Sequence, residues 1–248
     1  MNRYSTFAHD FYVNMNLSTE MELPGTRDTV LHYFDRLQKS YPEMRNFYCR
    51  DRNEFVLEEE KDRGHYRWAT VELRRVSSGH VNPERLEDAL KQHQLVLDLA
   101  PYLLSVSPMD CESLNVMFGF DFTYSGNQNQ VVAEALGVIP AMERMTDIPG
   151  ATIISHEPTI QLALDEDCRT QCRLSIETRT SAYHVRTGEY PEEQLSVYVA
   201  ARRYGSLDSG ETYVSAFDRL AQVCQDMVLD VPGRISNRIE LRECVNRI

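Results

Sequence analysis

The segment with the clearest chemical potential runs from Phe118 to Leu136, FGFDFTYSGNQNQVVAEAL. It predicts an alternating strand, a single glycine and the start of a helix, an arrangement that binds phosphate in nucleotide-binding proteins. Such phosphate-binding turns carry several glycines, or a glycine followed by lysine. This turn has Gly126 alone and no lysine. We therefore expect a structural turn, with Asn127 near the N-cap of the helix.

Acid–base catalysis has four candidate residues. Asp121 lies in the same very apolar strand, where desolvation would raise its pKa. His65, His156 and Glu177 lie at predicted strand ends or in loops. General acid–base catalysis needs such groups to converge in space, and their spacing in sequence does not show this.

Anion binding has a second set of candidates on the polar faces of the predicted strands. They are Arg74, Arg173, Arg179 and Arg202, together with Tyr198. If the strands share one sheet, these side chains lie on the side away from the helices. Two interpretations follow: a solvated face of mixed charge, or a concave surface that binds an anionic ligand or a partner.

The elements that position these residues form an internal repeat, with copies at about residues 7–103 and 108–232. Both copies show an alternating strand, then a glycine and the start of a helix; Gly25 in the first copy matches Gly126 in the second. A hairpin and a second helix follow in each copy. Six features in the same order favour a duplication.

The duplication predicts an α+β fold, in which two pseudo-repeats of strand–helix–hairpin–helix form a mainly antiparallel sheet with helices packed on one face. Residues 1–105 are the first pseudo-repeat. Residues 106–248 are the second, with an extra strand at 195–201 and a C-terminal tail. No flexible linker separates them, so we expect one shared core.

The second helix of each copy carries an apolar stripe. In the first copy Asn82 and Pro83 predict its N-cap and first turn. His93 falls on this stripe, and the matching position in the second copy is Cys224. We therefore interpret His93 as a packing residue.

The composition restricts the function classes. The chain has 38 acidic against 26 basic residues and a net charge of −12, which argues against nucleic-acid binding. It has no membrane-length apolar run, and its N-terminus lacks the apolar segment of a signal peptide. We expect a cytoplasmic protein without a membrane partner.

The cysteines predict neither a metal site nor a redox motif. The six cysteines are scattered, and only Cys168 and Cys172 lie close together, without further ligands at zinc-site spacing. Reduced, mostly buried thiols are the better interpretation. We expect neither a metal nor a cofactor.

The C-terminal tail places Arg234, Arg238 and Arg242 four residues apart. In a helix these arginines form one basic stripe. The stripe would lie on the protein's own acidic surface or dock to an acidic partner.

Two hypotheses for function remain. The leading one is a non-catalytic module that binds a small anionic ligand or a protein partner, including a second copy of the chain in a homodimer, on the polar sheet face or in a groove between the repeats. The alternative is an enzyme for an anionic substrate, with Asp121, His65, His156 and Glu177 in proton transfer and Arg173 and Arg202 holding the substrate.

Overall fold

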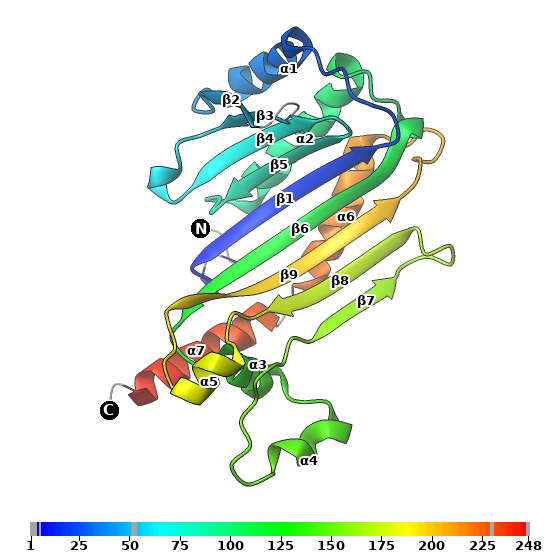
Figure 1. The fold of residues 1–248 in the computed structure, drawn as a ribbon. Coiled ribbons are helices and arrows are strands. Elements are labelled where there is room, and N and C mark those ends of the chain that lie inside the picture. Colours follow the sequence, from blue (N-terminus) through cyan, green and yellow to red (C-terminus); the bar gives the residue numbers. More distant parts are fainter. Residues whose placement is uncertain (1–3, 5, 51–53, 229–230, 247–248) are drawn as a thin grey trace.

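The chain folds around one antiparallel β-sheet (Figure 1). The computed structural model describes residues 4, 6–50, 54–228 and 231–246. Within these residues nine strands pair in the order β2-β3-β4-β5-β1-β6-β9-β8-β7. The strands are β1 (Asp10–Thr19), β2 (Asn46–Arg50), β3 (Glu54–Glu58), β4 (Tyr66–Glu72), β5 (Arg75–Val81), β6 (Cys111–Tyr124), β7 (Thr159–Ala163), β8 (Thr170–Glu177) and β9 (Glu193–Tyr204). The predictions of an α+β class and an antiparallel sheet are confirmed.

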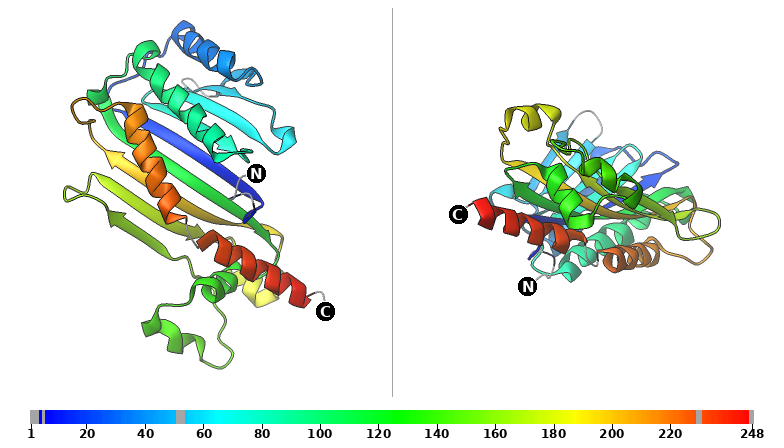
Figure 2. Two further views of the ribbon diagram at one scale, coloured as in Figure 1. Left: turned by 180° about the vertical axis from the view of Figure 1, so that it is seen from behind. Right: turned by 90° about the horizontal axis from the view of Figure 1, so that it is seen from below.

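Seven α-helices accompany the sheet in the described residues. They are α1 (Arg27–Ser40), α2 (Leu86–Leu103), α3 (Gln128–Leu136), α4 (Glu143–Thr146), α5 (Ala182–Thr187), α6 (Tyr213–Met227) and α7 (Val231–Asn246). Seen from behind, α2 and α6 both lie in front of the sheet (Figure 2). α6 packs on β6 and β9, and α2 packs on β5 and β1. We call the opposite face of the sheet the open face.

The two central strands carry the core. Val13, Met15 and Leu17 of β1 are fully buried, and they alternate with half-buried polar residues. In β6, Val116 and Phe118 are likewise fully buried on the helix side. Period-two alternation with one apolar face explains why these segments form strands rather than helices.

Three local features differ from the sequence-based expectation. β2 and β5 were not predicted as strands, because β2 is short and β5 carries the polar run Ser77–His80 in place of apolar alternation. The loop expected between β8 and β9 contains the short helix α5.

Asn82 is not an N-cap. α2 begins at Leu86 after Arg85, and Asn82 adopts a left-handed conformation with φ of 48°. Its side chain donates to Asp10 Oδ1 at 2.6 Å and to the Gly64 carbonyl at 2.7 Å. Asn82 therefore ties three segments together at one end of β1.

His93 lies in the core, as its place on the apolar stripe predicted. Its Nδ1 accepts from the Ser78 hydroxyl at 2.7 Å, and its Nε2 donates to the Val13 carbonyl at 3.2 Å. Burial lowers the pKa of His93 to about 3. Burial likewise lowers the pKa of His80 to about 3. Both imidazoles are therefore neutral at physiological pH.

These two histidines predict that stability falls in mild acid. Their folded-state pKa lies below the unfolded value of 6.5, so the unfolded chain takes up protons first. The free energy of unfolding should fall by about 2 kcal/mol per histidine between pH 7 and pH 5. Urea unfolding followed by circular dichroism measures this. His93→Gln should reduce the pH-dependent difference, whereas the exposed His32→Gln should not; equal wild-type stability at both pH values would contradict the prediction.

The basic stripe of the C-terminal tail packs against the protein itself. α7 lies beside α3. Arg238 Nη2 lies 2.6 Å from Glu134 Oε2, and Arg242 Nε donates to the same oxygen at 2.8 Å. Arg242 and Arg238, with Gln130, lower the pKa of Glu134 to about 2.

Glu134→Gln should weaken the docking of α7. The substitution leaves Arg238 and Arg242 without their shared carboxylate, and the partly exposed network contributes about 1 kcal/mol. Urea unfolding and hydrogen exchange of the α7 amides measure the loss. In the wild type this contribution is present above about pH 4.5 and is lost as the pH falls towards 2. The exposed Glu240→Gln is the control; equal effects of the two substitutions would refute this role for Glu134.

Candidate functional site

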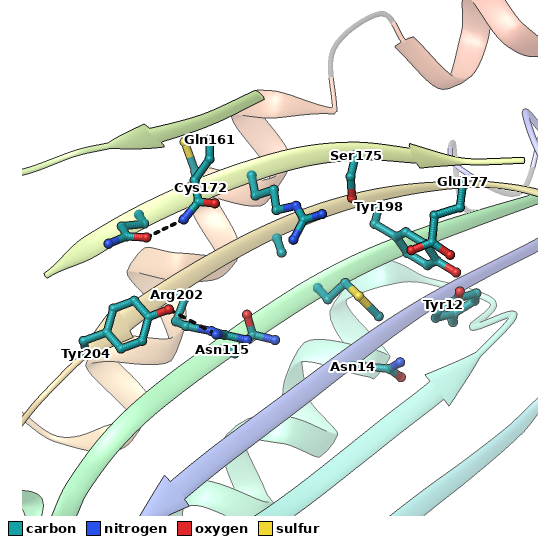
Figure 3. A pocket seen from close by; sticks show the side chains of 14 residues that line it. Tyr12, Asn14, Asn115, Gln161, Cys172, Ser175, Glu177, Tyr198, Arg202 and Tyr204 are labelled. Atoms are coloured by element: carbon teal, nitrogen blue, oxygen red, sulfur yellow. Dashed lines mark hydrogen bonds between the residues drawn. The ribbon is translucent and has the colours of Figure 1, made fainter. Parts of the chain in front are cut away.

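A hollow of about 560 Å³ lies on the open face over the second half of the sheet. We call it the arginine groove (Figure 3). Its lining comes from β1, β6, β7, β8 and β9. The lining residues are Tyr12, Asn14, Asn115, Met117, Gln161, Gln171, Cys172, Arg173, Ser175, Glu177, Tyr198, Ala200, Arg202 and Tyr204.

Strand register places the two arginines of the groove as diagonal neighbours. Arg202 on β9 lies opposite Gln171 of β8 and Asn115 of β6. Arg173 on β8 lies opposite Gln161 of β7 and the small Ala200 of β9. Side chains at such positions on one face are close enough to contact the same ligand.

Neither guanidinium has an acidic partner in the part of the chain that the structure describes. Arg202 donates to the Tyr204 hydroxyl at 3.1 Å and lies 5.6 Å from the centre of the same ring. Arg173 lines the groove without an ion pair. In a chain of net charge −12, two such arginines above one hollow form a local cationic site.

Amide side chains complete the donor set. Gln161 Nε2 donates to Gln171 Oε1 at 2.6 Å, which orients both amides at the β7–β8 edge of the groove. Asn115 lies on the central side, next to Arg202. The groove thus combines guanidinium, amide and phenol groups, all of which can donate to an anion.

The other predicted arginines lie outside the groove lining. β4 ends at Glu72, so Arg74 falls in the following turn, where it pairs with Glu22 at 3.7 Å. β8 ends at Glu177, and Arg179 beyond it pairs with that carboxylate at 3.5 Å. Strand parity had placed Arg74 and Arg179 on the strand faces, and this was wrong because both strands end earlier.

The four acid–base candidates are not joined in one site, although Asp121 and Glu177 share the open face, each opposite Ser196 of the intervening β9. Asp121 lies on β6, Glu177 ends β8, and His65 precedes β4. His156 lies in the loop before β7, where its backbone N–H donates to Asn129 Oδ1 at 2.7 Å. Within the described residues, no hydrogen bond or ion pair joins either histidine to Asp121 or Glu177.

Asp121 lies in the environment expected of it. It is only 8% exposed, and burial raises the pKa of its carboxyl, with the Ser196 and Tyr12 hydroxyls opposing part of the rise. The pKa of Tyr12 is raised, first by burial and then by the charge of Asp121. Asp121 and Tyr12 are thus electrostatically coupled on the open face.

Tyr12, Asn14, Gln171 and Tyr204 line the groove, although sequence reasoning did not select them. The signal for the first two was present: they occupy the alternate positions of β1, between its buried apolar residues. Their proximity to β8 and β9 depends on strand order, which the sequence does not show.

The glycine turn before α3 is structural. A Cβ on Gly126 would lie 2.6 Å from the Tyr124 ring, so a larger residue there would displace that ring. Asn127 caps α3 by accepting from Gln130 N–H, as predicted. The Gln128 N–H donates to Thr180 Oγ1 at 3.0 Å. Two amide groups at this helix terminus are thus already hydrogen-bonded within the chain.

Two further amides of this turn hold distant loops. Asn129 Nδ2 donates to the Ile154 carbonyl at 2.9 Å, and Gln128 Nε2 donates to the Glu193 carbonyl at 2.9 Å. Gln128 Oε1 accepts from the Arg179 N–H at 2.6 Å. The NQN run therefore fixes the entry to β7, the exit from β8 and the start of β9.

The described part of the chain shows neither a metal-binding group of side chains nor a membrane-spanning helix. No group of three His, Cys, Asp or Glu side chains there could hold a metal ion. None of the helices described is both long and apolar enough to cross a bilayer. No protein-family model, curated protein or solved structure matches the chain significantly.

Gly119 positions Tyr12 at the groove. A Cβ on Gly119 would lie 2.3 Å from the Tyr12 ring, so Gly119→Ala should displace the ring and lower the free energy of unfolding by about 1–2 kcal/mol. Gly25→Ala is the matched control, because a Cβ there meets no atom within 4 Å. Urea unfolding of both variants tests this; equal stabilities would show that Gly119 does not hold the ring in place.

Proposed function

We propose that the protein is a binding module whose arginine groove binds an anionic ligand carrying carboxylate or phosphate groups. The observation that carries the proposal is the pair Arg173 and Arg202, which face one hollow without acidic partners in the described residues. Paired guanidinium groups recognise such oxyanions by charge-assisted hydrogen bonds.

The first half of the open face supports this assignment by contrast. A hollow of about 340 Å³ lies over β3, β4 and β5 and also contains basic residues. There Arg50 pairs with Glu54 at 3.3 Å, and Lys61 pairs with Glu58 at 2.9 Å. Arg75 lies 3.9 Å from Glu72. Because these cations are already neutralised, anion binding is assigned to the second half alone.

We also infer that the two halves are copies of one unit. β5, β4 and β3 follow β1 towards one edge, and β9, β8 and β7 follow β6 towards the other. α2 and α6 each follow the strand next to the central pair. By this correspondence β9 matches β5, so the second copy has no extra strand, and β2 is the addition to the first. Superposition of residues 7–103 on 108–232 tests the inference.

The neighbours of His93 and Cys224 support the same correspondence. His93 contacts β1 and β5 through Val13 and Ser78. Cys224 Sγ lies 3.6 Å from the Val116 carbonyl of β6 and 3.8 Å from the Val199 carbonyl of β9. Each therefore sits over the first strand of its own copy and the strand beside it.

Replacing the groove arginines should weaken anion binding. Isothermal titration with citrate and with pyrophosphate measures affinity, and native mass spectrometry of the purified protein detects a retained ligand. Arg173→Gln/Arg202→Gln should weaken binding by about tenfold or more, because each charge-assisted hydrogen bond contributes about 1.5–3 kcal/mol. Binding should also weaken with added salt.

Arg50→Gln/Arg75→Gln is the charge-matched control, since it removes two arginines from the same face where both have carboxylate partners. It should leave anion affinity near the wild-type value. Equal loss in the two double variants would show that binding follows net charge and not the groove. Absence of binding to either probe and of any retained anion would refute the proposal.

A further inference from the structure

A second hollow, of about 440 Å³, adjoins the arginine groove and is walled by Tyr12 and Asn14 in common with it. We call it the aromatic–acidic hollow. The residues that determine its chemistry are Asp10, Tyr12, Asn14, Tyr66, Trp68 and Asp121. They come from β1, β4 and β6, and the hollow contains no arginine or lysine in its lining.

Two of the three aromatic rings lie flat on the sheet over glycines. A Cβ on Gly79 would lie 2.2 Å from Trp68 Nε1, and one on Gly119 would lie 2.3 Å from the Tyr12 ring. Trp68 and Gly79 are cross-strand neighbours, as are Tyr12 and Gly119. Each ring thus lies close to the backbone of its cross-strand glycine, and both rings line the hollow.

The third ring already binds an ammonium group of the chain. Lys61 Nζ lies 5.5 Å from the centre of the Tyr66 ring. A cation at this distance is attracted by the electron-rich ring face. Lys61 lines the hollow over β3, β4 and β5 and not this one, so the contact shows that the Tyr66 ring attracts an ammonium group.

Two carboxylates also line the hollow. Asp10 and Asp121 are cross-strand neighbours on β1 and β6. Asp10 is held by Asn82 at 2.6 Å. Asp121 is 92% buried, and its Oδ1 has no hydrogen-bond partner within the described residues. The Ser196 and Tyr12 hydroxyls hydrogen-bond to this carboxyl, but neither carries a positive charge, and a cation in the hollow would stabilise the buried carboxylate further.

The charged groups near Asp121 do not give it a cationic partner of its own. Arg179 is the cationic group that acts on Asp121, yet its guanidinium pairs with Glu177 at 3.5 Å. Asn14 Oδ1 also lacks a partner and lies on the same wall. The hollow therefore offers acceptors and ring faces and needs a donor that carries positive charge.

We propose that the aromatic–acidic hollow binds an organic ammonium group, primary or methylated, between the rings of Tyr12, Tyr66 and Trp68 and the carboxylates of Asp10 and Asp121. This site goes beyond the anion-binding function and does not depend on it. The combination of rings and acid distinguishes it from a metal site, which would need converging oxygen or nitrogen ligands.

Trp68 provides the readout, because it is the one tryptophan in the 248-residue sequence. Its fluorescence is titrated with choline, with the neutral isostere 3,3-dimethylbutan-1-ol, and with sodium chloride at matched ionic strength. Choline should give a saturable change, and neither of the other two should. Equal responses to choline and to the alcohol would overturn the proposal.

Asp121→Asn keeps the shape of the side chain and removes its charge, and it should weaken choline binding by about tenfold or more. The control is the exposed Asp147→Asn, which should bind as the wild type does. Tyr66→Leu tests the ring wall in a second background, in case Asp121→Asn does not fold. Unchanged choline binding in folded Asp121→Asn or Tyr66→Leu protein would overturn the proposal.

One more variant distinguishes the ammonium site from the arginine groove. Arg173→Gln/Arg202→Gln should bind choline with wild-type affinity, since neither arginine lines the aromatic–acidic hollow. Absence of anion binding would contradict only the proposed anion site. Absence of choline binding would contradict only the proposed ammonium site.

Discussion

The antiparallel pairing of β1 with β6 is the interaction on which the other elements depend. These two long strands run side by side from Asp10 opposite Asp121 to Leu17 opposite Leu114 without a break in register. A slip of one residue would turn every apolar side chain to the open face. The buried sets of the two strands therefore lock the register, and the register in turn decides which polar residues meet on the other side.

Strict alternation in the central strands gives the two faces of the sheet different side chains. One face carries fully buried aliphatic and aromatic side chains beneath α2 and α6. The other carries arginines, carboxylates and aromatic rings. Gly79 and Gly119 interrupt the open face where an aromatic ring must approach the backbone. Glycine weakens a strand, so its use twice in the centre of the sheet marks places where the surface shape matters.

The sequence was most informative where the pattern was local and strong. β1, β6 and β9 were found from period-two alternation, and α1, α2, α3 and α6 from apolar stripes and caps. β5 was missed because Ser77, Ser78 and Gly79 lack an apolar pattern. Ser78 is nevertheless fully buried, and its hydroxyl is hydrogen-bonded to His93. Arg74 and Arg179 were misplaced because parity was extended past strand ends, which alternation alone does not show.

The candidate site could be predicted only in part, for a different reason. Arg173, Arg202 and Tyr198 were identified from strand parity, because facing outwards is a local property. They lie in one groove with Tyr12 and Asn14 only because the strands are ordered β1, β6, β9, β8. This order is set by pairing between strands that are distant in sequence. The buried turn before α3 shows the same limit: Asn127 was predictable as a cap, whereas the bonds of Gln128 and Asn129 to residues 25 to 65 positions away were not.

Tyr12 belongs to both hollows of the open face. Its ring lies close to Gly119, and the charge of Asp121 acts on its hydroxyl. A displacement of the ring would change the lining of both hollows. Thermodynamic linkage then requires that whatever factor one occupant imposes on the affinity of the second is imposed in return. If both proposed ligands bind, the shared phenol would make the affinity for each depend on the presence of the other.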